Sequence, residues 1–156
     1  MPVRIRAFVK SDFEALWQLD QVCFDREMAY SHLELAFYMR RPGAFTLIAE
    51  SGEVGAQHEQ ERLAGFVVAE ARRKRGHIIT IDVDPKARRA GVGSALLDAA
   101  ENQLRKAGVL VVALETAVNN VAAIRFYKQR GYFVDKTMPG YYSGRVDGFE
   151  MSKELD

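Results

Sequence analysis

The chain has 156 residues, and 22 Lys and Arg against 21 Asp and Glu give it a formal charge of +1 at pH 7. This length predicts a single domain over residues 1–156. The near-neutral charge argues against a nucleic-acid partner, because such proteins usually carry a clear basic excess. Cys23 is the only cysteine, so the sequence excludes an intrachain disulfide and a cysteine-based zinc site.

The N-terminal residues lack the apolar core of a signal peptide, and no apolar run approaches the roughly 20 residues that cross a bilayer. We therefore expect a soluble, cytoplasmic protein with no membrane partner. The histidines His32, His58 and His77 show no metal-ligand spacing. We expect no bound metal and assign all three to structural or solvent-exposed positions.

The chain begins with a predicted strand and a predicted helix. Val3–Phe8 alternates apolar and basic residues, which is typical of a strand with one face in solvent. Ser11–Glu14 matches a capping box, in which the serine caps a helix and the glutamate reaches back to the serine N–H. The helix that follows has an apolar stripe that includes Cys23, and we expect a plain buried thiol there rather than a nucleophile.

A second helix and another strand follow. Ser31–Glu34 is also a capping box, and its helix should extend to about Met39 and end before Pro42. Phe45–Glu50 predicts a strand. The polar, glycine-bearing stretch 51–62 predicts a loop or an extended hairpin turn.

The second half of the chain alternates strands and helices. Leu63–Arg72 and His77–Asp84 are apolar, β-rich runs joined by Arg73–Gly76, which predicts a β-hairpin with a solvated basic turn. The remaining predicted elements are helices over Ser94–Ala107 and Val121–Arg130, a strand over Val109–Glu115, and final strands over Tyr132–Asp135 and Val146–Ser152 with a turn-rich link, Met138–Gly144, between them. This order predicts a mixed sheet with helices on its faces, in the α/β (α+β) class.

A glycine-bearing, basic turn lies where the His77–Asp84 strand gives way to a helix. Such a turn can direct several backbone N–H groups and the positive end of the helix dipole at one anion. Gly91 and Gly93 permit a close approach of backbone and ligand, and Arg88 and Arg89 can add charge-assisted hydrogen bonds. The ligand indicated is a phosphate or a pyrophosphate.

Two familiar phosphate loops do not match this turn. A P-loop ends in Gly-Lys-Ser/Thr, whereas Val92-Gly93-Ser94 has no lysine. The dinucleotide fingerprint requires a third glycine at the position that Leu96 occupies. On the residues alone, the alternative that these glycines only form a tight turn stays open.

The spacing Arg88-x-x-Gly91-x-Gly93, directly after Val83-Asp-Pro85, resembles the acetyl-coenzyme-A loop of the GNAT superfamily of N-acetyltransferases. Further family landmarks follow in the expected order, namely Leu114-Glu115, Asn120, Ala122–Tyr127 and Arg130–Tyr132. The resemblance is strong over residues 63–132. It implies a single GNAT-like domain with a mixed, mostly antiparallel central sheet flanked by helices.

Within the superfamily the chain is most similar to the RimI-type ribosomal-protein N-terminal acetyltransferases. The ending Gly140-Tyr-Tyr142, followed by Asp147 and Met151, resembles the ending of that group. Phe24–Tyr30 departs from it, because this stretch lacks the group's Pro-Trp-Ser sequence. Since that region shapes the acceptor site in the family, the departure bears on the acceptor more than on the reaction.

The reaction implied by the resemblance is direct attack of an amine on the acetyl thioester, with acetyl-CoA as co-substrate and no covalent enzyme intermediate. Glu115, which ends an apolar strand, is then the candidate general base. Tyr127 is the candidate general acid for the departing thiolate, because its phenol is a neutral donor at pH 7. The competing interpretations are an exposed strand-end carboxylate and a core tyrosine.

The resemblance also implies the coenzyme site. Strands that separate near residues 81–83 free backbone groups for the acetyl and pantetheine parts, and Asn120 either caps a helix or binds the coenzyme. The expected coenzyme-binding residues are Ile81, Asp82, Val83, Arg88, Arg89, Ala90, Gly91, Val92, Gly93, Ser94, Asn120 and Tyr127.

The sequence leaves the identity of the amine acceptor open. At pH 7 deprotonation costs roughly 1 kcal/mol for an α-amine and about 4.6 kcal/mol for a lysine, from ordinary pKa values near 8 and 10.4. A lone glutamate suits the easier task, which favours a protein or peptide N-terminus, and Tyr141 and Tyr142 could form one wall of a peptide slot. The alternatives are a small-molecule amine such as a polyamine, amino acid or aminoglycoside, and a coenzyme-binding module without turnover. Dimers are common in the superfamily, so a homodimer is compatible with the sequence.

Overall fold

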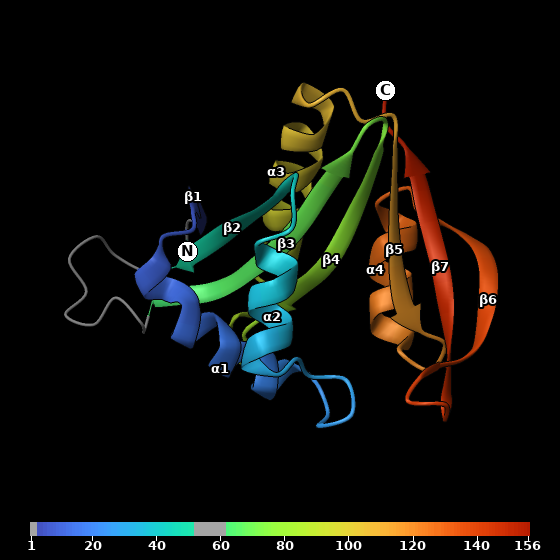
Figure 1. Ribbon diagram of the computed structural model, residues 1–156, viewed down its shortest axis with the longest axis horizontal. Coiled ribbons are helices and arrows are strands. Elements are labelled where there is room, and N and C mark those ends of the chain that lie inside the picture. The colour runs from blue at the N-terminus through green and yellow to red at the C-terminus, as the bar shows by residue number, and fades with distance from the viewer. Residues whose placement is uncertain (1–2, 52–61) are drawn as a thin grey trace.

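The computed structural model describes residues 3–51 and 62–156 (Figure 1). Most of the loop predicted at 51–62 and His58 therefore lie outside the described residues. The elements in chain order are β1 (Val3–Ala7), η1 (Lys10–Asp12), α1 (Phe13–Cys23), α2 (His32–Met39), β2 (Ala44–Ser51), β3 (Leu63–Arg72), β4 (Arg75–Val83), η3 (Pro85–Ala87), α3 (Val92–Lys106), β5 (Val111–Ala117), α4 (Val121–Gln129), β6 (Phe133–Tyr142) and β7 (Val146–Glu154).

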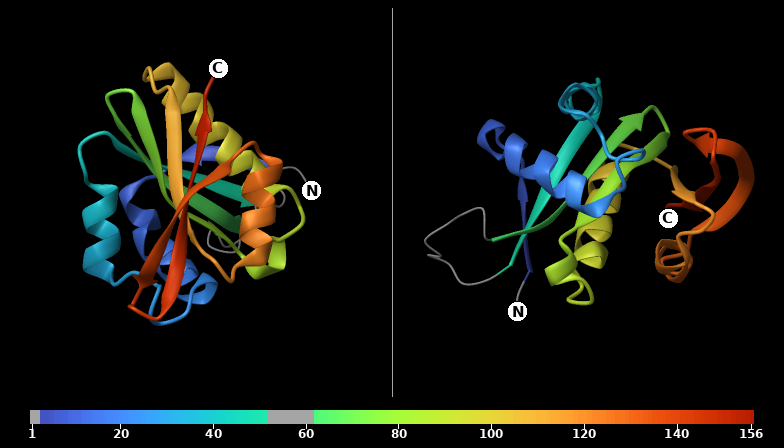
Figure 2. Two further views of the ribbon diagram at one scale, coloured as in Figure 1. Left: turned by 90° about the vertical axis from the view of Figure 1, so that its right-hand side faces the viewer. Right: turned by 90° about the horizontal axis from the view of Figure 1, so that it is seen from below.

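The strands form one mixed sheet in the order β1-β2-β3-β4-β5-β7-β6. Among the pairs that the described strands make, β4 with β5 is parallel and the others are antiparallel. Helices α1 and α2 cover one face, and α3 and α4 lie on the other, as the two views in Figure 2 show. The predicted class, a mostly antiparallel mixed sheet flanked by helices, is confirmed.

Each face of the sheet has its own apolar core. The α3 side is filled by α3 residues such as Leu96 and Leu104 packed against Val67 and Leu114. The α1–α2 side is filled by Leu16 and other residues of α1, α2, β2 and β3. These cores fix the two helical layers, so side chains that alternate along β4 and β5 face different layers.

One of the two predicted capping boxes is present. Ser31 Oγ accepts a hydrogen bond from the Glu34 N–H, and the Glu34 carboxylate accepts one from the Ser31 N–H. The prediction at Ser11 was wrong, because the chain first makes the short helix η1. There the Asp12 carboxylate accepts from the Val9 N–H and also pairs with Arg6, so Asp12 takes the capping role.

Several other boundaries differ from prediction. Strand β5 covers Val111–Ala117 rather than residues 109–115, so Glu115 lies inside the strand and does not end it. Helix α3 begins at Val92, two residues earlier than expected, which places Gly93 inside its first turn. The β3–β4 hairpin is tighter, since Arg72 already pairs with Arg75. Strand β6 extends to Tyr142, through most of the predicted turn-rich link, because it pairs with β7 across two irregular steps.

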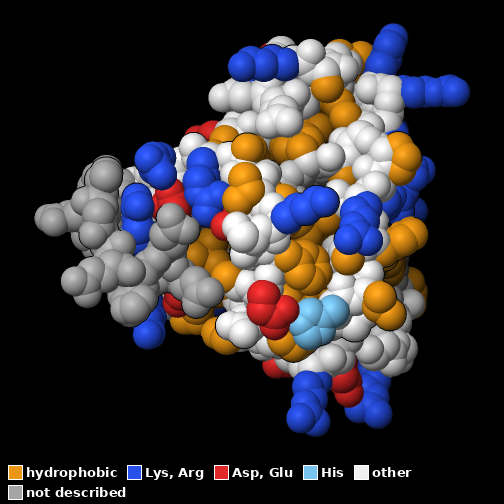
Figure 3. Space-filling view, turned by 60° about the vertical axis from the view of Figure 1, so that its left-hand side comes forward, with side chains coloured by type: hydrophobic (Ala, Val, Ile, Leu, Met, Phe, Trp, Pro, Cys, Tyr) orange, Lys and Arg blue, Asp and Glu red, His pale blue; other side chains and the backbone are white. Residues whose placement is uncertain are grey.

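Some apolar side chains remain at the surface. Leu33 and Phe37, one turn apart on α2, are 85% and 62% exposed. Figure 3 shows hydrophobic side chains in patches among Lys and Arg on one face of the molecule. None of the helices within residues 3–51 and 62–156 is long and apolar enough to cross a membrane.

Candidate active site

The candidate site is built on the divergence of two parallel strands. Strands β4 and β5 pair only from Arg75–Val111 to His77–Ala113. Beyond His77, β4 keeps its bonds to β3 while β5 keeps its bonds to β7, and Figure 1 shows the two strands separating. Backbone groups of residues 78–83 that face β5 are therefore left without a strand partner. This is the separation that the resemblance implied near Ile81–Val83.

The glycine-bearing turn lies at the open end of β4. The Asp84 carboxylate accepts from the Lys86 N–H and starts the turn η3. Gly91 then takes a left-handed conformation, with φ of 82°, as the N-cap residue of α3. A Cβ built on Gly91 would have no heavy atom within 4 Å. The backbone before α3 is thus both strained for other residues and open to a ligand.

The first turn of α3 suits an anion. Gly91 offers no side chain that could cap the first N–H groups of the helix, and the first turn holds no acidic residue. Orphan N–H groups and the positive end of the dipole favour a phosphate there. Arg88 and Arg89 are both exposed beside this turn. The residues present therefore fit the pyrophosphate group of acetyl-CoA.

Cys23 lies near this turn but is not poised as a nucleophile. Its Sγ–H donates to the Val83 carbonyl across 3.3 Å. Burial, followed by the charge of Asp82, raises the pKa of the Cys23 thiol to about 12, against smaller opposing effects that include Arg88. The thiol therefore stays protonated at neutral pH, although Cys23 is half-buried rather than buried as expected.

Glu115 is held by a histidine that sequence reasoning missed. Nε2 of His77 lies 2.7 Å from Glu115 Oε1 and donates to it, since a carboxylate can only accept. The exposed fractions of these side chains are 35% for His77 and 19% for Glu115. Their contact occurs at the last paired step of β4 and β5, where the strands begin to separate.

A second carboxylate, that of Glu70, lies near the other ring nitrogen of His77. The Nδ1 atom of His77 is 3.8 Å from Glu70 Oε1, and Glu70 also forms an ion pair with Arg41 at 3.1 Å. Burial acts to lower the His77 pKa, but the hydrogen bond and charge of Glu115, with the charge of Glu70, raise it above its usual value. His77 thus holds a proton more readily than an isolated histidine at neutral pH.

Tyr127 lies on α4 and packs in the α3-side core. Its ring is 5.8 Å from the Tyr132 ring and 5.2 Å from the Phe126 ring, between centroids. Burial, and then the charge of Asp82, raises the Tyr127 pKa above its usual value. The phenol therefore remains a neutral donor. Asn120 caps this helix, because its Oδ1 accepts from the Ala123 N–H at 3.1 Å.

Tyr141 and Tyr142 end β6 with ring centroids 4.9 Å apart. Burial, Tyr141, Glu115 and Tyr127 all raise the pKa of Tyr142, in that order. Of the expected acceptor wall, the structure thus brings the two tyrosine rings into contact with each other.

The β6–β7 turn also meets the segment 24–31 between α1 and α2. Ser143 Oγ–H donates to the Glu27 carbonyl across 3.3 Å, and Arg145 donates to the Glu27 carboxylate at 3.0 Å. The departing Phe24–Tyr30 stretch therefore lies against the tyrosine-bearing turn. Both segments border the same side of the site.

Asp82 was expected among the coenzyme-binding residues, and its backbone lies on the freed section of β4. Its side chain, however, is fully buried on the α1 side, where burial and then Asp20 raise the pKa of its carboxyl well above the usual range. Sequence reasoning missed Asp20, since a carboxylate near the end of an amphipathic helix is usually exposed. It missed His77 as well, although a β-α-β order predicts that β4 and β5 are neighbours. The order does not fix the register of the two strands, so the sequence could not place His77 opposite Ala113 and near Glu115.

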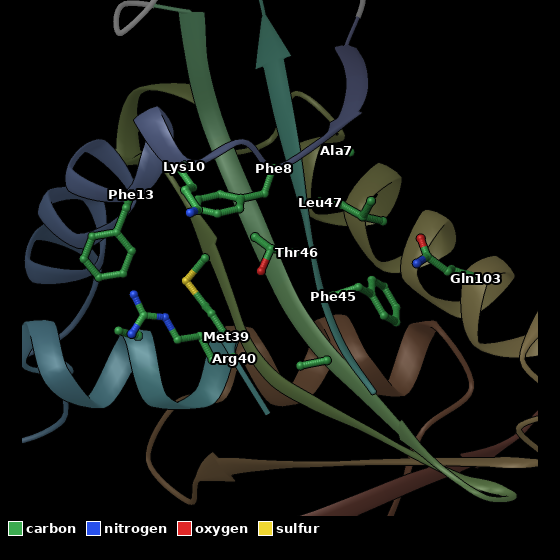
Figure 4. Close-up of a pocket in the computed structure, with 12 residues that line it drawn as sticks. Ala7, Phe8, Lys10, Phe13, Met39, Arg40, Phe45, Thr46, Leu47 and Gln103 are labelled. Carbon is green, nitrogen blue, oxygen red and sulfur yellow. The ribbon is translucent and has the colours of Figure 1, made fainter. Parts of the chain in front are cut away.

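A hollow of about 670 Å³ lies away from these residues, against β2 (Figure 4). In the close-up Phe8, Phe13 and Lys10 lie on one side of β2, and Leu47 extends towards α3 on the other. The lining residues are Ala7, Phe8, Lys10, Phe13, Ala36, Met39, Arg40, Ala44, Phe45, Thr46, Leu47 and Gln103. None of them is an expected site residue, so this hollow is separate from the candidate active site.

Known proteins share this fold and sequence. The crystal structure of Ard1 from Thermoplasma volcanium superposes with a TM-score of 0.86 at 28% identity, covering 100% of this chain and 99% of that one. An uncharacterised N-acetyltransferase of Methanocaldococcus jannaschii is 31% identical over 151 residues, which are 96% of this chain and 90% of the relative. The ribosomal protein bS18-alanine N-acetyltransferase of Salmonella typhimurium is 26% identical over 132 residues, 85% of this chain and 82% of the relative.

These similarities define the protein as an acyltransferase, and more narrowly as an N-acetyltransferase. The acetyltransferase (GNAT) family profile matches residues 12–132. The chain belongs to the GNAT family, which confirms the resemblance carried by its Arg88–Gly93 turn and the motifs that follow it.

Proposed function

We propose that this protein transfers the acetyl group of acetyl-CoA to the α-amine at the N-terminus of a protein or peptide. The observation that carries the proposal is the Glu115–His77 pair at the point where β4 and β5 separate. The pair places a hydrogen-bonded carboxylate beside unpaired β4 backbone, with an anion-binding turn at the far end of the same strand. Acceptor amine and acetyl donor can then meet at one place.

In this proposal Glu115 receives the proton of the amine, directly or through water, while His77 orients the carboxylate. A carboxylate held by one strong hydrogen bond keeps its other oxygen for the amine or water. Tyr127 donates a proton to the thiolate as the C–S bond breaks, so no covalent enzyme intermediate forms. The raised pKa of Tyr127 keeps its phenol protonated for this role.

The donor is held by the turn 88–94 and the free β4 backbone. The N–H groups before and within the first turn of α3 would bind the pyrophosphate, with Arg88 and Arg89 adding charge. Ile81 and Val83 would offer backbone groups to the pantetheine. The open space beside Gly91 supports this assignment, since a side chain there would fill the ligand's place.

The acceptor side favours a cationic amine at the end of a peptide. Glu150 on β7 lies directly opposite Glu115 on β5, so two carboxylates can attract an ammonium group. Tyr141 and Tyr142 supply flat apolar surface with hydroxyl groups, which suits an extended peptide. The names of two relatives, bS18-alanine N-acetyltransferase and Ard1, add support for a protein N-terminus.

A panel of acceptors tests the proposal by mass spectrometry after incubation with acetyl-CoA. The panel holds peptides with varied first residues, lysine peptides with blocked N-termini, polyamines and aminoglycosides. Acetylation of free N-termini supports the proposal and ranks the preferred first residue. Acetylation of polyamines or aminoglycosides alone would overturn it in favour of a small-molecule enzyme. Binding of acetyl-CoA without any product would favour a module without turnover.

A further inference from the structure

Two carboxyl groups lie buried against each other outside the Glu115–His77 pair. Asp20 is in the last turns of α1, and Asp82 is near the end of β4. Both residues are 0% exposed. Carboxylates are almost never fully buried unless a partner compensates for the loss of water. Groups around Asp20 and Asp82 must therefore compensate both carboxyls for the loss of water.

Each carboxyl has one donor among the described residues. Asp20 Oδ2 accepts from the Tyr30 N–H at 2.8 Å, and Asp82 Oδ1 accepts from the Thr80 hydroxyl at 2.6 Å. The other oxygens, Oδ1 of Asp20 and Oδ2 of Asp82, are buried and have no donor within the described part of the chain. Asp20 raises the pKa of Asp82 through a side-chain hydrogen bond and through its charge, and these two oxygens are the atoms of the pair left free for such a bond. Two ionised carboxylates can only accept, so this bond requires a proton on one of them.

The surroundings favour such a shared proton. The charge of Asp82 acts on Cys23 of α1, Tyr30 of the following segment and Tyr127 of α4, and the pKa values of all three are raised. They stay neutral at pH 7, so they do not offset a second negative charge. Arg88 lies nearby and acts on Cys23. Burial and then Asp20 raise the Asp82 pKa well above its usual range, while the Thr80 hydrogen bond opposes this.

The pair connects the acceptor side of the site to β4. Asp20 holds the Tyr30 N–H, while Trp17 Nε1–H and Gln21 Nε2–H both donate to the Tyr30 carbonyl. These bonds fix the end of segment 24–31, whose Glu27 contacts the β6–β7 turn. Through Asp82 the same segment is joined to the freed section of β4, which includes Ile81 and Val83. The Cys23 thiol, which donates to the Val83 carbonyl, is a second link between α1 and this section of β4.

We propose that Asp20 and Asp82 share one proton and act as a positioning pair that holds segment 24–31 against β4. The acceptor amine is then held next to the acetyl group of the donor. This inference deepens the proposed function and rests on it for the identity of the acceptor side. Loss of the proton at high pH would leave two negative charges in contact, which would separate α1 from β4. The KM for the acceptor then rises, while acetyl-CoA binding at the turn 88–94 stays unchanged.

Three variants separate the steps of this inference. Asp82→Asn keeps a donor towards Asp20 without a titrating proton, so it preserves the contact at every pH. Asp82→Ala removes the contact and leaves the buried Asp20 carboxylate short of a donor, which should raise the acceptor KM roughly tenfold. Glu101→Gln is the matched control, because Glu101 is also buried, at 2% exposure, but accepts from Tyr132 and Lys153 elsewhere.

The first measurement needs no acceptor. Infrared spectra of the wild-type protein at neutral pH should show the carbonyl stretch of a protonated carboxyl, which Asp82→Asn removes and Glu101→Gln leaves. The protection factor of the Tyr30 amide hydrogen, which removes the intrinsic rise of exchange with pH, should fall at high pH in the wild type and not in Asp82→Asn. A wild-type spectrum with no protonated carboxyl, or one that Asp82→Asn leaves intact, would overturn the shared proton.

The second measurement is the acceptor KM against pH, with whichever amine the panel identifies. The wild type should lose acceptor affinity on the alkaline side, Asp82→Asn should not, and kcat should change little in either. An acceptor KM in Asp82→Ala equal to that of the wild type would overturn the positioning role. If Asp82→Ala does not fold, Asp82→Asn decides: a rise of its acceptor KM at high pH as large as that of the wild type would overturn the role. A protein that acetylates no N-terminus would refute the proposed function, yet the infrared and exchange results would still decide the shared proton.

Discussion

Nε2 of His77 lies 2.7 Å from Oε1 of Glu115, and this contact sits at the last step where β4 and β5 are paired. The same geometry that opens the sheet for a ligand thus also orients the candidate base. The first two predictions concern this pair.

Glu115→Gln should lower kcat/KM for the acceptor by about 100- to 10,000-fold, the usual contribution of a positioned general base. The amide keeps the size of the carboxylate but cannot take the amine's proton. His77→Gln should lower kcat/KM less, because Glu115 remains and loses only its orientation. Steady-state kinetics with acetyl-CoA titrations check this. Equal acetyl-CoA affinity in all three proteins is expected, and weaker coenzyme binding in Glu115→Gln would point to a structural role.

The His77–Glu115 bond should make folding stability depend on pH. Because the His77 pKa is raised in the folded protein, the folded state binds more protons than the unfolded state above about pH 6.5. The stabilisation is complete below the unfolded pKa and is lost as the pH rises through the folded pKa. The difference in unfolding free energy between wild type and His77→Gln should therefore shrink as the pH rises above about 6.5 in urea titrations. A constant difference would contradict the raised pKa.

Gly91→Ala and Gly91→Val should weaken acetyl-CoA binding by roughly tenfold or more, since each hydrogen bond to a charged group contributes about 1.5–3 kcal/mol. The added side chain enters open space beside the anion-binding turn and strains a backbone with φ of 82°. Gly108→Ala is the control, because Gly108 has φ of 88° and equal open space at the other end of α3. Calorimetric titration should show weaker binding only for the Gly91 variants. Unchanged binding in Gly91→Val would show that the turn does not hold the phosphate.

Cys23→Ala should leave acetyl transfer within a few-fold of wild type. The Cys23 thiol has a pKa of about 12 and donates to the Val83 carbonyl, so it is not a nucleophile at neutral pH. Activity assays and slow labelling by a thiol reagent check this together. An acetylated Cys23, or activity lost in a Cys23→Ala protein that still folds, would support a covalent mechanism instead.

Ser31→Ala should destabilise the protein by about 1 kcal/mol, because Ser31 caps α2 with a reciprocal bond from Glu34. Ser11→Ala is a matched comparison and should change stability by less than about 0.5 kcal/mol. Ser11 lies in η1, where Asp12 takes the capping role. Chemical unfolding of both variants measures the contrast. Equal losses would show that the two serines cap alike.

Local sequence signals predicted most of the fold. Residues that begin or end helices and strands allowed many elements to be placed correctly. The predicted bounds Leu63–Arg72 match β3, and Gly108 follows the end of α3 with a positive φ. The failures lie where two local signals competed. Ser11 and Asp12 could each cap a helix, and the ion pair of Asp12 with Arg6 decided between them. The sequence of Met138–Gly144 predicts a turn-rich link, but pairing with β7 keeps most of this stretch extended.

The site could be predicted only where the residues belong to one local motif. The turn Arg88–Gly93 and the ends of β5 and α4 carry their signal in spacing along the chain. Asp20 and His77 do not, because each meets its partner, Asp82 or Glu115, from 38 or more residues away. Such contacts depend on strand order and on which face of the sheet each helix covers. They become visible only in three dimensions.

The central claim is that this protein acetylates an α-amine with Glu115 as base. The most direct test uses one peptide in two forms, one with a free N-terminus and acetylated lysine, the other with an acetylated N-terminus and free lysine. Mass spectrometry should show acetyl-CoA-dependent mass gain on the first form only, with the rate greatly reduced in Glu115→Gln. Acetylation of the second form alone, or an equal rate in Glu115→Gln, would contradict the account.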